Sequence, residues 1–502
     1  MASPSTRSAV RSLAFQSASS QLQFPTLAKT TDQSIDATNT PVGSRDHDAT
    51  TDTFPLTQEQ TNSQIEEFID SINEDAICDL ASRYRGQGPC TVLGRDRGSF
   101  NVCFFVHFGT DNVRWVVRVP LKPVVVNPWA KIQSEVATLR FIQDNTTIPV
   151  PRVRAFGTEA TLIPGSSEAP SFLICDYIPG VPLQMKALVE APQDQRKQFY
   201  GELIDILAQL YSIEFATAGS LIPNPAGKSE PAVGDIISLP ANELLMDRPG
   251  LQSTTAHTDG QYMAYHHHVL SETYRLPTQD LSEDQVQLEL FAIESLAKFI
   301  KSAEPAQSAG PFVLSHLDLR CHNVIITGDL HMRGIIDWEF SGTIPRRLFT
   351  PPPWLTGHDS SAAWACPLTA PVMHFQLYPE FLEVLQEKST FDSNCAQLWK
   401  EWKHVPELWF SLAQILRRPS CLTELYYRSM FPRLFEDSDY KVQVPKFFKD
   451  VDDSGLALEA KHRIEQSICY TRYLKDQGLF IEDEESQRIQ EFIVKAKEIL
   501  KK

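Results

Sequence analysis

The chain has 502 residues and a formal net charge of −17 at pH 7, with 42% hydrophobic and 22% charged residues. A chain of this length folds as two or three units, and its composition excludes a fibrous or wholly disordered protein. The negative charge opposes binding to nucleic acid or to an anionic membrane surface, and no apolar run approaches the roughly 20 residues that cross a bilayer, so we expect neither partner.

The first 56 residues are rich in Ser, Thr, Ala, Gln and Asp and have no sustained apolar pattern, which predicts a disordered tail over 1–56. Up to Lys29 this tail has three basic residues and no acidic one. That composition fits a mitochondrial transit peptide, and a solvated tail without an address is the alternative. Nine scattered cysteines without a CxxC pair fit a reducing compartment. We therefore expect a cytoplasmic protein, with the mitochondrial matrix as the alternative.

Residues 57–178 predict a β-rich first lobe. Apolar residues at spacings of three to five predict a helix over 58–83, and a second helix is expected over 130–144. Short β-prone runs separated by glycines and polar turns predict five strands. These runs are 90–93, 102–108, 115–119, 153–156 and 172–177. The first three form an antiparallel meander, so the lobe has one antiparallel sheet and one inserted helix.

Residues 179–440 predict a larger, mainly helical lobe, and 441–502 predict a C-terminal helical part packed on it. The helices are recognised by their apolar stripes. They are expected over 196–214, 286–302, 375–387, 396–417 and 456–473. The exception is the strand-rich stretch 312–340. A small sheet lobe followed by a helical lobe with one hairpin-like island is the element order of an α+β two-lobe protein.

The densest set of reactive side chains lies in 315–323 (SHLDLRCHN) and in 334–339 (GIIDWE), at the ends of apolar runs. Transfer of a γ-phosphoryl group needs a carboxylate that orients the attacking hydroxyl, oxygen ligands for Mg²⁺ and cations around the phosphates. Asp318, Asn323 and Asp337 supply two carboxylates and one amide. Mg²⁺ keeps water and substrate oxygens in its shell, so one Asn and one Asp suffice as protein ligands.

The pattern His316-x-Asp318-Leu319-x-x-x-Asn323 with IIDWE at 335–339 resembles the aminoglycoside phosphotransferase and choline kinase group, in a fungal-type branch of the kinase-like superfamily. The resemblance implies a two-lobe protein kinase-like fold, ATP and Mg²⁺ as cofactors, and a hydroxyl of a small molecule as the phosphate acceptor. It implies that Asp318 is the catalytic base, that Asn323 and Asp337 bind the metal, and that His316 supports the loop. Arg320 would lie near the γ-phosphate. Protein kinases carry DFG instead of IIDWE, which ranks a protein kinase last.

The resemblance extends over roughly residues 85–360 and includes the nucleotide site. Gly94 to Gly98 and Ser99 lie where the family places its phosphate-covering loop. A full GxGxxG is missing, and a plain hairpin turn is the alternative. Arg118 takes the position of the family's phosphate-binding lysine, and Glu135 on the next helix would be its partner. Arginine is not equivalent to lysine there, and an ordinary salt bridge is the alternative.

The last strand of the first lobe runs into a segment that resembles the family's hinge between lobes. The backbone groups of Asp176, Tyr177 and Ile178 would hold the adenine. Residues from about 375 onward carry no motif for the acceptor, so amino sugars, amino alcohols and secondary metabolites stay open. A pseudokinase, which binds nucleotide or partners without catalysis, is the alternative to an enzyme.

Three further residues or groups lie outside these motifs. The triplet 266–268 (HHH) invites a metal site, but consecutive histidines point to different faces and cannot all bind one ion, so we predict a solvated helix segment. Glu339 is expected to touch the metal or to bond backbone amides. His322 is expected to be a neighbour of the site without a role in proton transfer.

Overall fold

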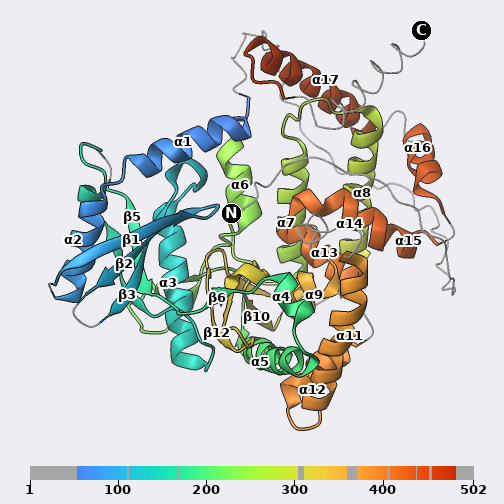
Figure 1. The fold of residues 1–502 in the computed structure, drawn as a ribbon. Helices are drawn as coiled ribbons and strands as arrows, with labels where there is room; N and C mark the ends of the chain where they lie inside the picture. Colours follow the sequence, from blue (N-terminus) through green and yellow to red (C-terminus); the bar gives the residue numbers. More distant parts are fainter. Residues whose placement is uncertain are drawn as a thin grey trace, which may run out of the picture.

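The computed structural model describes residues 54–86, 88–109, 112–167, 169–302, 310–358, 370–403, 407–436, 438–450 and 455–481. Nearly all of the predicted tail 1–56, and the end of the predicted C-terminal part, therefore lie outside the described residues. The described chain forms a sheet lobe and a helical lobe (Figure 1). Within these ranges no helix is long and apolar enough to span a bilayer.

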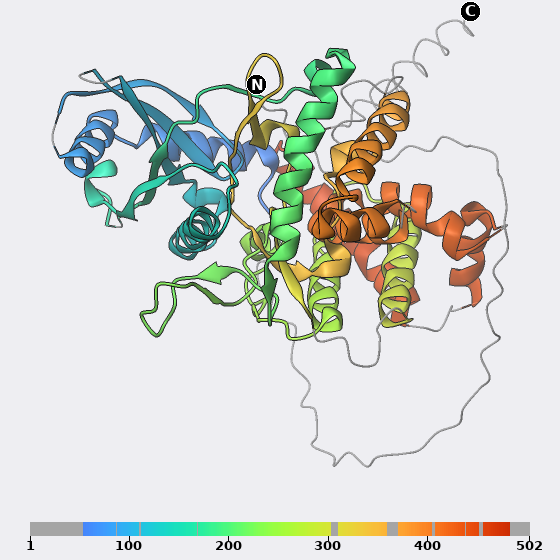
Figure 2. The same cartoon turned by 90° about the horizontal axis from the view of Figure 1, so that it is seen from below.

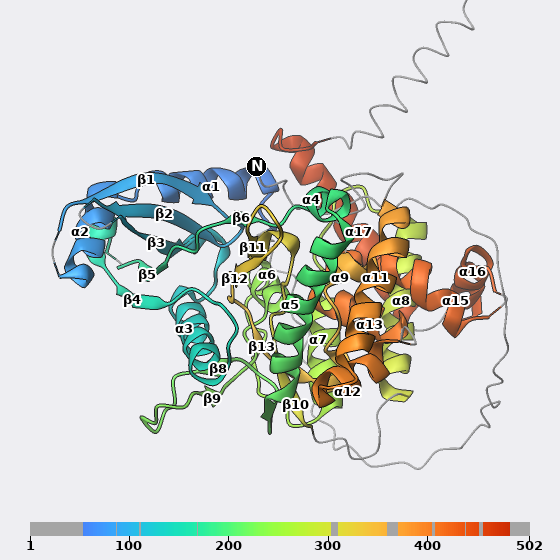
Figure 3. The same cartoon turned by 60° about the horizontal axis from the view of Figure 1, so that its bottom comes forward.

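The first lobe is built on one antiparallel sheet with the strand order β1-β2-β3-β5-β4. Its strands are β1 (Cys90–Arg97), β2 (Asn101–Phe108), β3 (Val113–Pro120), β4 (Val153–Thr158) and β5 (Ser171–Asp176). Helix α3 (Pro128–Asn145) lies beside the sheet, toward the second lobe (Figures 1 and 3). The five predicted strands, the meander and the inserted helix are all confirmed.

The helix predicted over 58–83 is two helices, α1 (Gln58–Asp70) and α2 (Glu74–Arg85). The apolar periodicity continues across the break, so periodicity alone does not reveal it. The side chain of Asn73 accepts a hydrogen bond from the Ala76 amide at 3.1 Å and caps α2. Apolar side chains of both helices, such as Ile69 and Ile77, are buried in one core with those of β2 and β3.

The second lobe is mainly helical. Its helices are α4 (Met185–Glu190), α5 (Gln193–Ser212), α6 (Leu239–Asp247), α7 (Asp259–Tyr274), α8 (Glu283–Ser302), α9 (Pro353–Thr356), α11 (Ala370–Lys388), α12 (Ser393–Trp402), α13 (Glu407–Arg417), α14 (Leu422–Leu425), α15 (Phe431–Leu434), α16 (Tyr440–Asp450) and α17 (Gly455–Asp476). Short 3₁₀ or π segments are Lys122–Val124, Ala160–Leu162, Cys321–Asn323, Arg346–Leu348, Pro419–Cys421 and Tyr426–Met430. Figure 2 shows α5 in the middle of the molecule, between the sheet lobe and the C-terminal helices.

Four of the five helices predicted for this lobe are confirmed as α5, α8, α11 and α17. The prediction of one helix over 396–417 was wrong, because this segment is divided into α12 and α13. Helix α12 ends at its C-cap Lys403, and α13 begins at Glu407. The apolar stripe resumes after the break, which is why the sequence pattern looks continuous.

Two small sheets include the strand-rich stretch of the second lobe. Strand β11 (Val324–Ile326) pairs antiparallel with β12 (Met332–Ile335), as the predicted hairpin requires, and with β6 (Val181–Pro182). Strand β10 (Phe312–Ser315) pairs with β13 (Gly342–Pro345) and β7 (Glu214–Phe215). A further two-stranded pair joins β8 (Leu221–Ile222) to β9 (Ala232–Val233). Figure 3 shows β6, β11 and β12 between the first-lobe sheet and α5.

Glycines allow the hinge after β5 to pack closely on this hairpin. A Cβ atom on Gly334 would lie 2.5 Å from the Ile178 side chain, which is closer than atoms in contact can approach. Gly180 has φ +150, and a Cβ atom there would lie 2.7 Å from the Ile326 carbonyl. The hinge is therefore held against the strands that carry the reactive loops.

Candidate active site

The first reactive loop joins β10 to β11 and presents Asp318. The Arg320 amide donates to the Asp318 carbonyl at 2.8 Å, and the Asn323 side-chain amide donates to the same oxygen at 2.8 Å. The Trp354 indole donates to the Leu319 carbonyl at 3.0 Å from the far side of the loop. These bonds fold the loop back on itself and fix the direction of Asp318.

The second reactive loop follows β12, and its backbone is bonded to the first loop. The Ile336 amide donates to the Asn323 carbonyl at 2.9 Å. Nε2 of His316 lies 2.9 Å from the Ile336 carbonyl, and its ring packs on Trp338 at 4.7 Å between centroids. Burial lowers the pKa of His316, so the ring is neutral and positioned to support both loops. Asp337 has a left-handed backbone, with φ 69.

Arg118 on β3 connects α3 with the second loop. It forms the predicted ion pair with Glu135, and its Nη2 lies 2.6 Å from Asp337 Oδ1 and 3.5 Å from Glu339 Oε2. Burial alone would lower the pKa of Arg118, but the three carboxylates outweigh burial and raise it. Arg118 is therefore a permanent cation that links β3, α3 and the loop after β12.

The contacts that the structure shows for Glu339 are made to side chains and not to backbone amides. Glu339 accepts a hydrogen bond from Asn101 Nδ2 at 2.6 Å and forms an ion pair with Lys131. Lys131 is 1% exposed and also donates to Asn101 Oδ1 at 2.9 Å. Lys131 was missed as a site residue. One signal was present, because Lys131 stands four residues before Glu135 and so shares its helix face.

Asp318 is held by two arginines. Its Oδ1 lies 2.9 Å from Arg320 Nε and 2.5 Å from Arg418 Nη2. Burial would raise the pKa of Asp318, but the charges of Arg418 and Arg320 outweigh burial and lower it. Arg418 directly follows α13, 100 residues away in the sequence, and no motif marks it. The structure thus adds a second cation at the predicted catalytic carboxylate.

Asp337 and Asn323 offer the oxygen donors that Mg²⁺ prefers. Because the Asn323 amide nitrogen is bonded to the Asp318 carbonyl, its amide oxygen is directed elsewhere, and it accepts no hydrogen bond from the described residues. Burial and the neighbouring carboxylate Glu339 raise the pKa of Asp337 to about 7, so a cation would relieve a local excess of negative charge. This donor set fits Mg²⁺. Among the described residues no cluster of three or more His, Cys, Asp and Glu side chains could hold a metal.

The predicted phosphate-covering loop begins later than expected. Gly94 lies within β1 opposite Phe105, beside a bulge between Val92 and Gly94. The strand continues to Arg97 because its charged residues pair with α1, as Arg95 does with Asp70 at 2.9 Å. The expectation of a loop over 94–98 was therefore wrong for Gly94.

The turn between β1 and β2 comprises Gly98, Ser99 and Phe100, and the Gly98 amide donates to the Asn101 carbonyl at 2.9 Å. The Phe100 ring packs edge-on against Phe340 at 5.1 Å between centroids. This contact brings the turn to the loop that carries Asp337. Gly98 and Ser99 are exposed there.

At the hinge, two of the three predicted residues already use their backbone amides. The Asp176 amide donates to the Arg152 carbonyl at 3.0 Å, and the Tyr177 amide donates to the Arg114 carbonyl at 3.2 Å. The Asp176 side chain is held by Arg154 through two bonds of 2.6 and 2.7 Å. Hydrogen bonds to an adenine would therefore come from Ile178 and from carbonyl oxygens of this segment.

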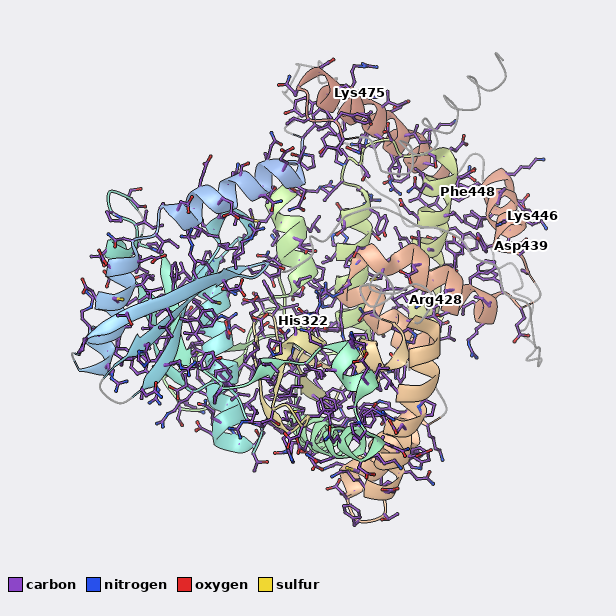
Figure 4. The ribbon with its side chains drawn as sticks, in the orientation of Figure 1. His322, Arg428, Asp439, Lys446, Phe448 and Lys475 are labelled. Carbon is purple, nitrogen blue, oxygen red and sulfur yellow. The ribbon has the colours of Figure 1, made fainter. Side chains whose placement is uncertain are left out.

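The histidine triplet lies in α7, but the prediction that it is solvated was wrong for its first member. His266 is 3% exposed, and His267 lies 2.9 Å from the Ile293 carbonyl. Only His268 of the three is exposed. His322 is exposed, and Figure 4 shows it near the middle of the view, well apart from Lys475 on α17.

Two hollows meet at Asp318. One extends toward α7 and α13, and the other extends toward α5 and the segment 349–353. Leu317, Asp318, Arg417 and Arg418 line both. A small molecule in either hollow would lie against the Asp318 carboxylate.

Residues 101–347 match the family described as the phosphotransferase enzyme family, and this range includes both reactive loops. A curated relative, the clavilactone A biosynthesis cluster protein Y of Ampulloclitocybe clavipes, is 22% identical over 238 residues. That match covers 46% of this chain and 55% of the relative, so it spans little more than half of that protein.

Solved structures with some similarity include a Ralstonia eutropha JMP134 protein assigned to the aminoglycoside phosphotransferases, with 14% identity, a TM-score of 0.42, and coverage of 79% of this chain and 98% of that one. A Plasmodium vivax ethanolamine kinase has 12% identity, a TM-score of 0.38, and coverage of 76% and 83%. A macrolide 2'-phosphotransferase type I has 14% identity, a TM-score of 0.35, and coverage of 75% and 98%. Similarities this low carry no functional argument.

Proposed function

Because residues 101–347 belong to the phosphotransferase enzyme family, we propose that this protein transfers the γ-phosphoryl group of ATP to a hydroxyl of a small molecule. The observation that carries the proposal is the position of Asp318. Two arginines keep its carboxylate ionised, two hollows open onto it, and its loop is bonded to the loop that carries Asp337.

Asp318 would orient the acceptor hydroxyl. Both arginines contact its Oδ1, and we expect Oδ2 to accept the hydrogen bond from the hydroxyl. A carboxylate with a lowered pKa is a weak base, which suits a transfer in which the protein mainly positions its reactants. The acceptor oxygen forms a bond to the γ-phosphorus, the bond to the bridging oxygen breaks to release ADP, and the hydroxyl proton passes through Asp318 to solvent.

Asn323 and Asp337 would hold the Mg²⁺ that accompanies ATP. When bound, the ion supplies positive charge at the phosphate oxygens. Arg118 would add a fixed cation from β3, held in place by Glu135. Arg320 forms an ion pair with Asp318 in this structure. Its long side chain would turn toward the γ-phosphate once ATP is bound.

The adenine would lie against the hinge after β5, with hydrogen bonds to Ile178 and to carbonyl oxygens of the same segment. The turn at Gly98 and Ser99 would cover the phosphates, since Phe100 already packs on Phe340. Gly94 is not assigned to this role, because it lies within β1.

One observation favours the alternative of a pseudokinase that binds nucleotide without catalysis. Arg118 occupies the position of the usual lysine and contacts three carboxylates, Glu135, Asp337 and Glu339. An arginine so well paired in the absence of nucleotide would be less available to phosphates. The enzyme is preferred because Asp318, Asn323 and Asp337 are all present, and the loop of the first two is bonded to the loop of the third.

The test is a search for metabolites that gain a phosphate when a cell extract is incubated with the protein, ATP and Mg²⁺. The wild type is expected to produce at least one new phosphorylated metabolite by mass spectrometry, and Asp318→Asn none. Asp329→Asn is the matched control, because Asp329 is exposed in the turn between β11 and β12. Products made equally by Asp318→Asn would remove Asp318 from its role.

Thermal unfolding with ATP and Mg²⁺ separates the two candidates. A ligand that binds the native state raises its stability, so both an enzyme and a nucleotide-binding pseudokinase gain stability at millimolar nucleotide. Stabilisation of the wild type together with no phosphorylated product would favour the pseudokinase. No stabilisation would contradict nucleotide binding altogether.

A further inference from the structure

The hollow between α7 and α13 has mostly apolar walls. Its apolar lining residues are contributed by both reactive loops, β13, the segment before α9, and α13. They include Leu317, Phe340, Ile344, Leu348, Ala413 and Leu416. This hollow is partly open to solvent, and a small organic molecule that enters it would contact Asp318 at one end. An apolar lining of this kind favours an apolar molecular body.

Asp318 is the single carboxylate among the residues that line this hollow, and two arginines already neutralise it. An acceptor with several positive charges would need carboxylates to replace its hydration. The described lining offers such an acceptor two cations, Arg417 and Arg418, which would repel it.

Arg417 is the cation in this hollow that lacks a counter-ion. Its Nη2 donates to the Leu348 carbonyl at 2.6 Å and its Nη1 to Thr350 Oγ1 at 3.2 Å, and no carboxylate of the described chain pairs with it. Burial lowers the pKa of Arg417 to about 10, so it stays charged at neutral pH. Arg418 differs, because Asp318 and Glu243 both act on it. Arg417 is partly exposed in the hollow, so its charge is accessible to a bound anion.

Two neutral polar groups in the same hollow are also unsatisfied. Neither ring nitrogen of His266 has a hydrogen-bond partner among the described residues, although its side chain is almost fully buried. Burial lowers the pKa of His266 to about 3, so the ring is neutral and offers one donor and one acceptor. The hydroxyl of Ser238, which is 3% exposed, is also without a partner. Buried polar groups are nearly always bonded, so these groups are available to a molecule that enters the hollow.

We propose that the acceptor is a predominantly apolar hydroxy compound with a carboxylate group, and that this hollow binds it with the carboxylate at Arg417 and a further hydrogen bond to His266. The inference rests on the proposed function, because it assigns the acceptor hydroxyl to Asp318. It selects a hydroxy acid over the amino sugars and amino alcohols that the sequence left open. The carboxylate takes no part in the transfer and serves to place the hydroxyl.

The test uses three matched probes that differ in one group: 4-(hydroxymethyl)benzoate, 4-methylbenzyl alcohol and 4-(aminomethyl)benzyl alcohol. Binding to the full chain is measured by calorimetry without ATP, so no turnover is needed. The carboxylate probe is expected to bind at least about tenfold more tightly than the methyl probe, which is the gain typical of a hydrogen bond to a charged group. The ammonium probe is expected to bind more weakly than both. Equal or tighter binding of the ammonium probe, or no binding of the carboxylate probe at millimolar concentration, would overturn the proposal.

Two variants locate the binding site. Arg417→Gln is expected to weaken the carboxylate probe about tenfold and to leave the methyl probe unchanged. His266→Phe removes two unsatisfied nitrogens, so its unfolding temperature is expected to stay equal or to rise while the probe binds more weakly. Arg275→Gln is the control, because Arg275 pairs with Glu272 and Glu459 at the surface. If both variants fold and bind the carboxylate probe as tightly as the wild type, the proposed binding site is refuted. If Arg417→Gln does not fold, the affinity of His266→Phe for this probe decides alone.

The proposed function and this inference fail in different ways. Asp318→Asn is expected to abolish phosphate transfer and to keep the preference for the carboxylate probe, because Arg417 is intact. Transfer by the wild type to amino alcohols, with no preference for the carboxylate probe, would sink the inference and leave the proposed function standing.

Discussion

Replacement of Lys131 by methionine should destabilise the protein by breaking a buried ion pair. Lys131 is 1% exposed and the side chain of Glu339 is 7% exposed, and the two form an ion pair between α3 and the loop after β12. In Lys131→Met the Glu339 carboxylate stays buried without its nearest cation. The lysine also holds Asn101, at the start of β2, through a bond of 2.9 Å.

The size of the effect follows from what remains around Glu339. Breaking one side of a buried pair typically costs about 3–5 kcal/mol. Arg118 is still 3.5 Å away and Asn101 still donates at 2.6 Å, so we expect the lower end, about 3 kcal/mol. Adding Glu339→Gln to Lys131→Met removes the uncompensated charge. The double variant should therefore lose about 2 kcal/mol less unfolding free energy than the two single variants lose in sum.

The assay is urea unfolding followed by circular dichroism for the wild type, both single variants and the double variant. Lys186→Met is the control, because the Lys186 and Glu190 pair is exposed on α4 and should contribute less than about 1 kcal/mol. Single losses that simply add in the double variant, or a cost below about 1 kcal/mol for Lys131→Met, would refute the reasoning.

Two further predictions concern other buried charges. The folded-state pKa of Asp337 is raised to about 7, so wild-type stability without Mg²⁺ should fall as pH rises from about 4 through 7. Asp337→Asn should abolish that fall in thermal unfolding, and an unchanged pH profile would contradict the assignment. Arg463→Met leaves Glu289 buried without its partner between α17 and α8 and should cost about 3 kcal/mol in urea unfolding. The double variant Arg463→Met and Glu289→Met should regain most of this stability. If it regains none, the loss does not come from the unpaired Glu289 carboxylate.

Much of the fold was predictable because its elements carry a clear period. The strands of the first lobe alternate or run apolar for a few residues, and the long helices carry continuous stripes, so five strands and most large helices were placed correctly. Breaks inside a periodic segment were not predictable in the same way. The cap at Asn73 and the division between α12 and α13 leave the apolar stripe intact, so periodicity does not show where one helix ends and the next begins.

Candidate residues of the site could be named from the sequence where they belong to a recognisable motif, and not where only tertiary contacts bring them together. Asp318, Asn323 and Asp337 belong to one short pattern, whereas Arg418 reaches Asp318 from 100 residues away and carries no motif. The burial of His266 could not be read from a run of three histidines. Gly94 was expected in a loop because the residues after it are mostly charged and show no apolar alternation. In the structure β1 continues through them, with a bulge beside Gly94 and an ion pair from Arg95 to α1.

The central claim is that Asn323 and Asp337 together hold a metal ion on the phosphates of ATP. Calorimetric titration with a non-hydrolysable ATP analogue, with and without Mg²⁺, tests it most directly. We predict that Mg²⁺ strengthens binding to the wild type at pH 8, and that Asn323→Ala and Asp337→Ala each abolish this gain while they keep the weak metal-free affinity. The same gain in wild type and both variants would contradict the account.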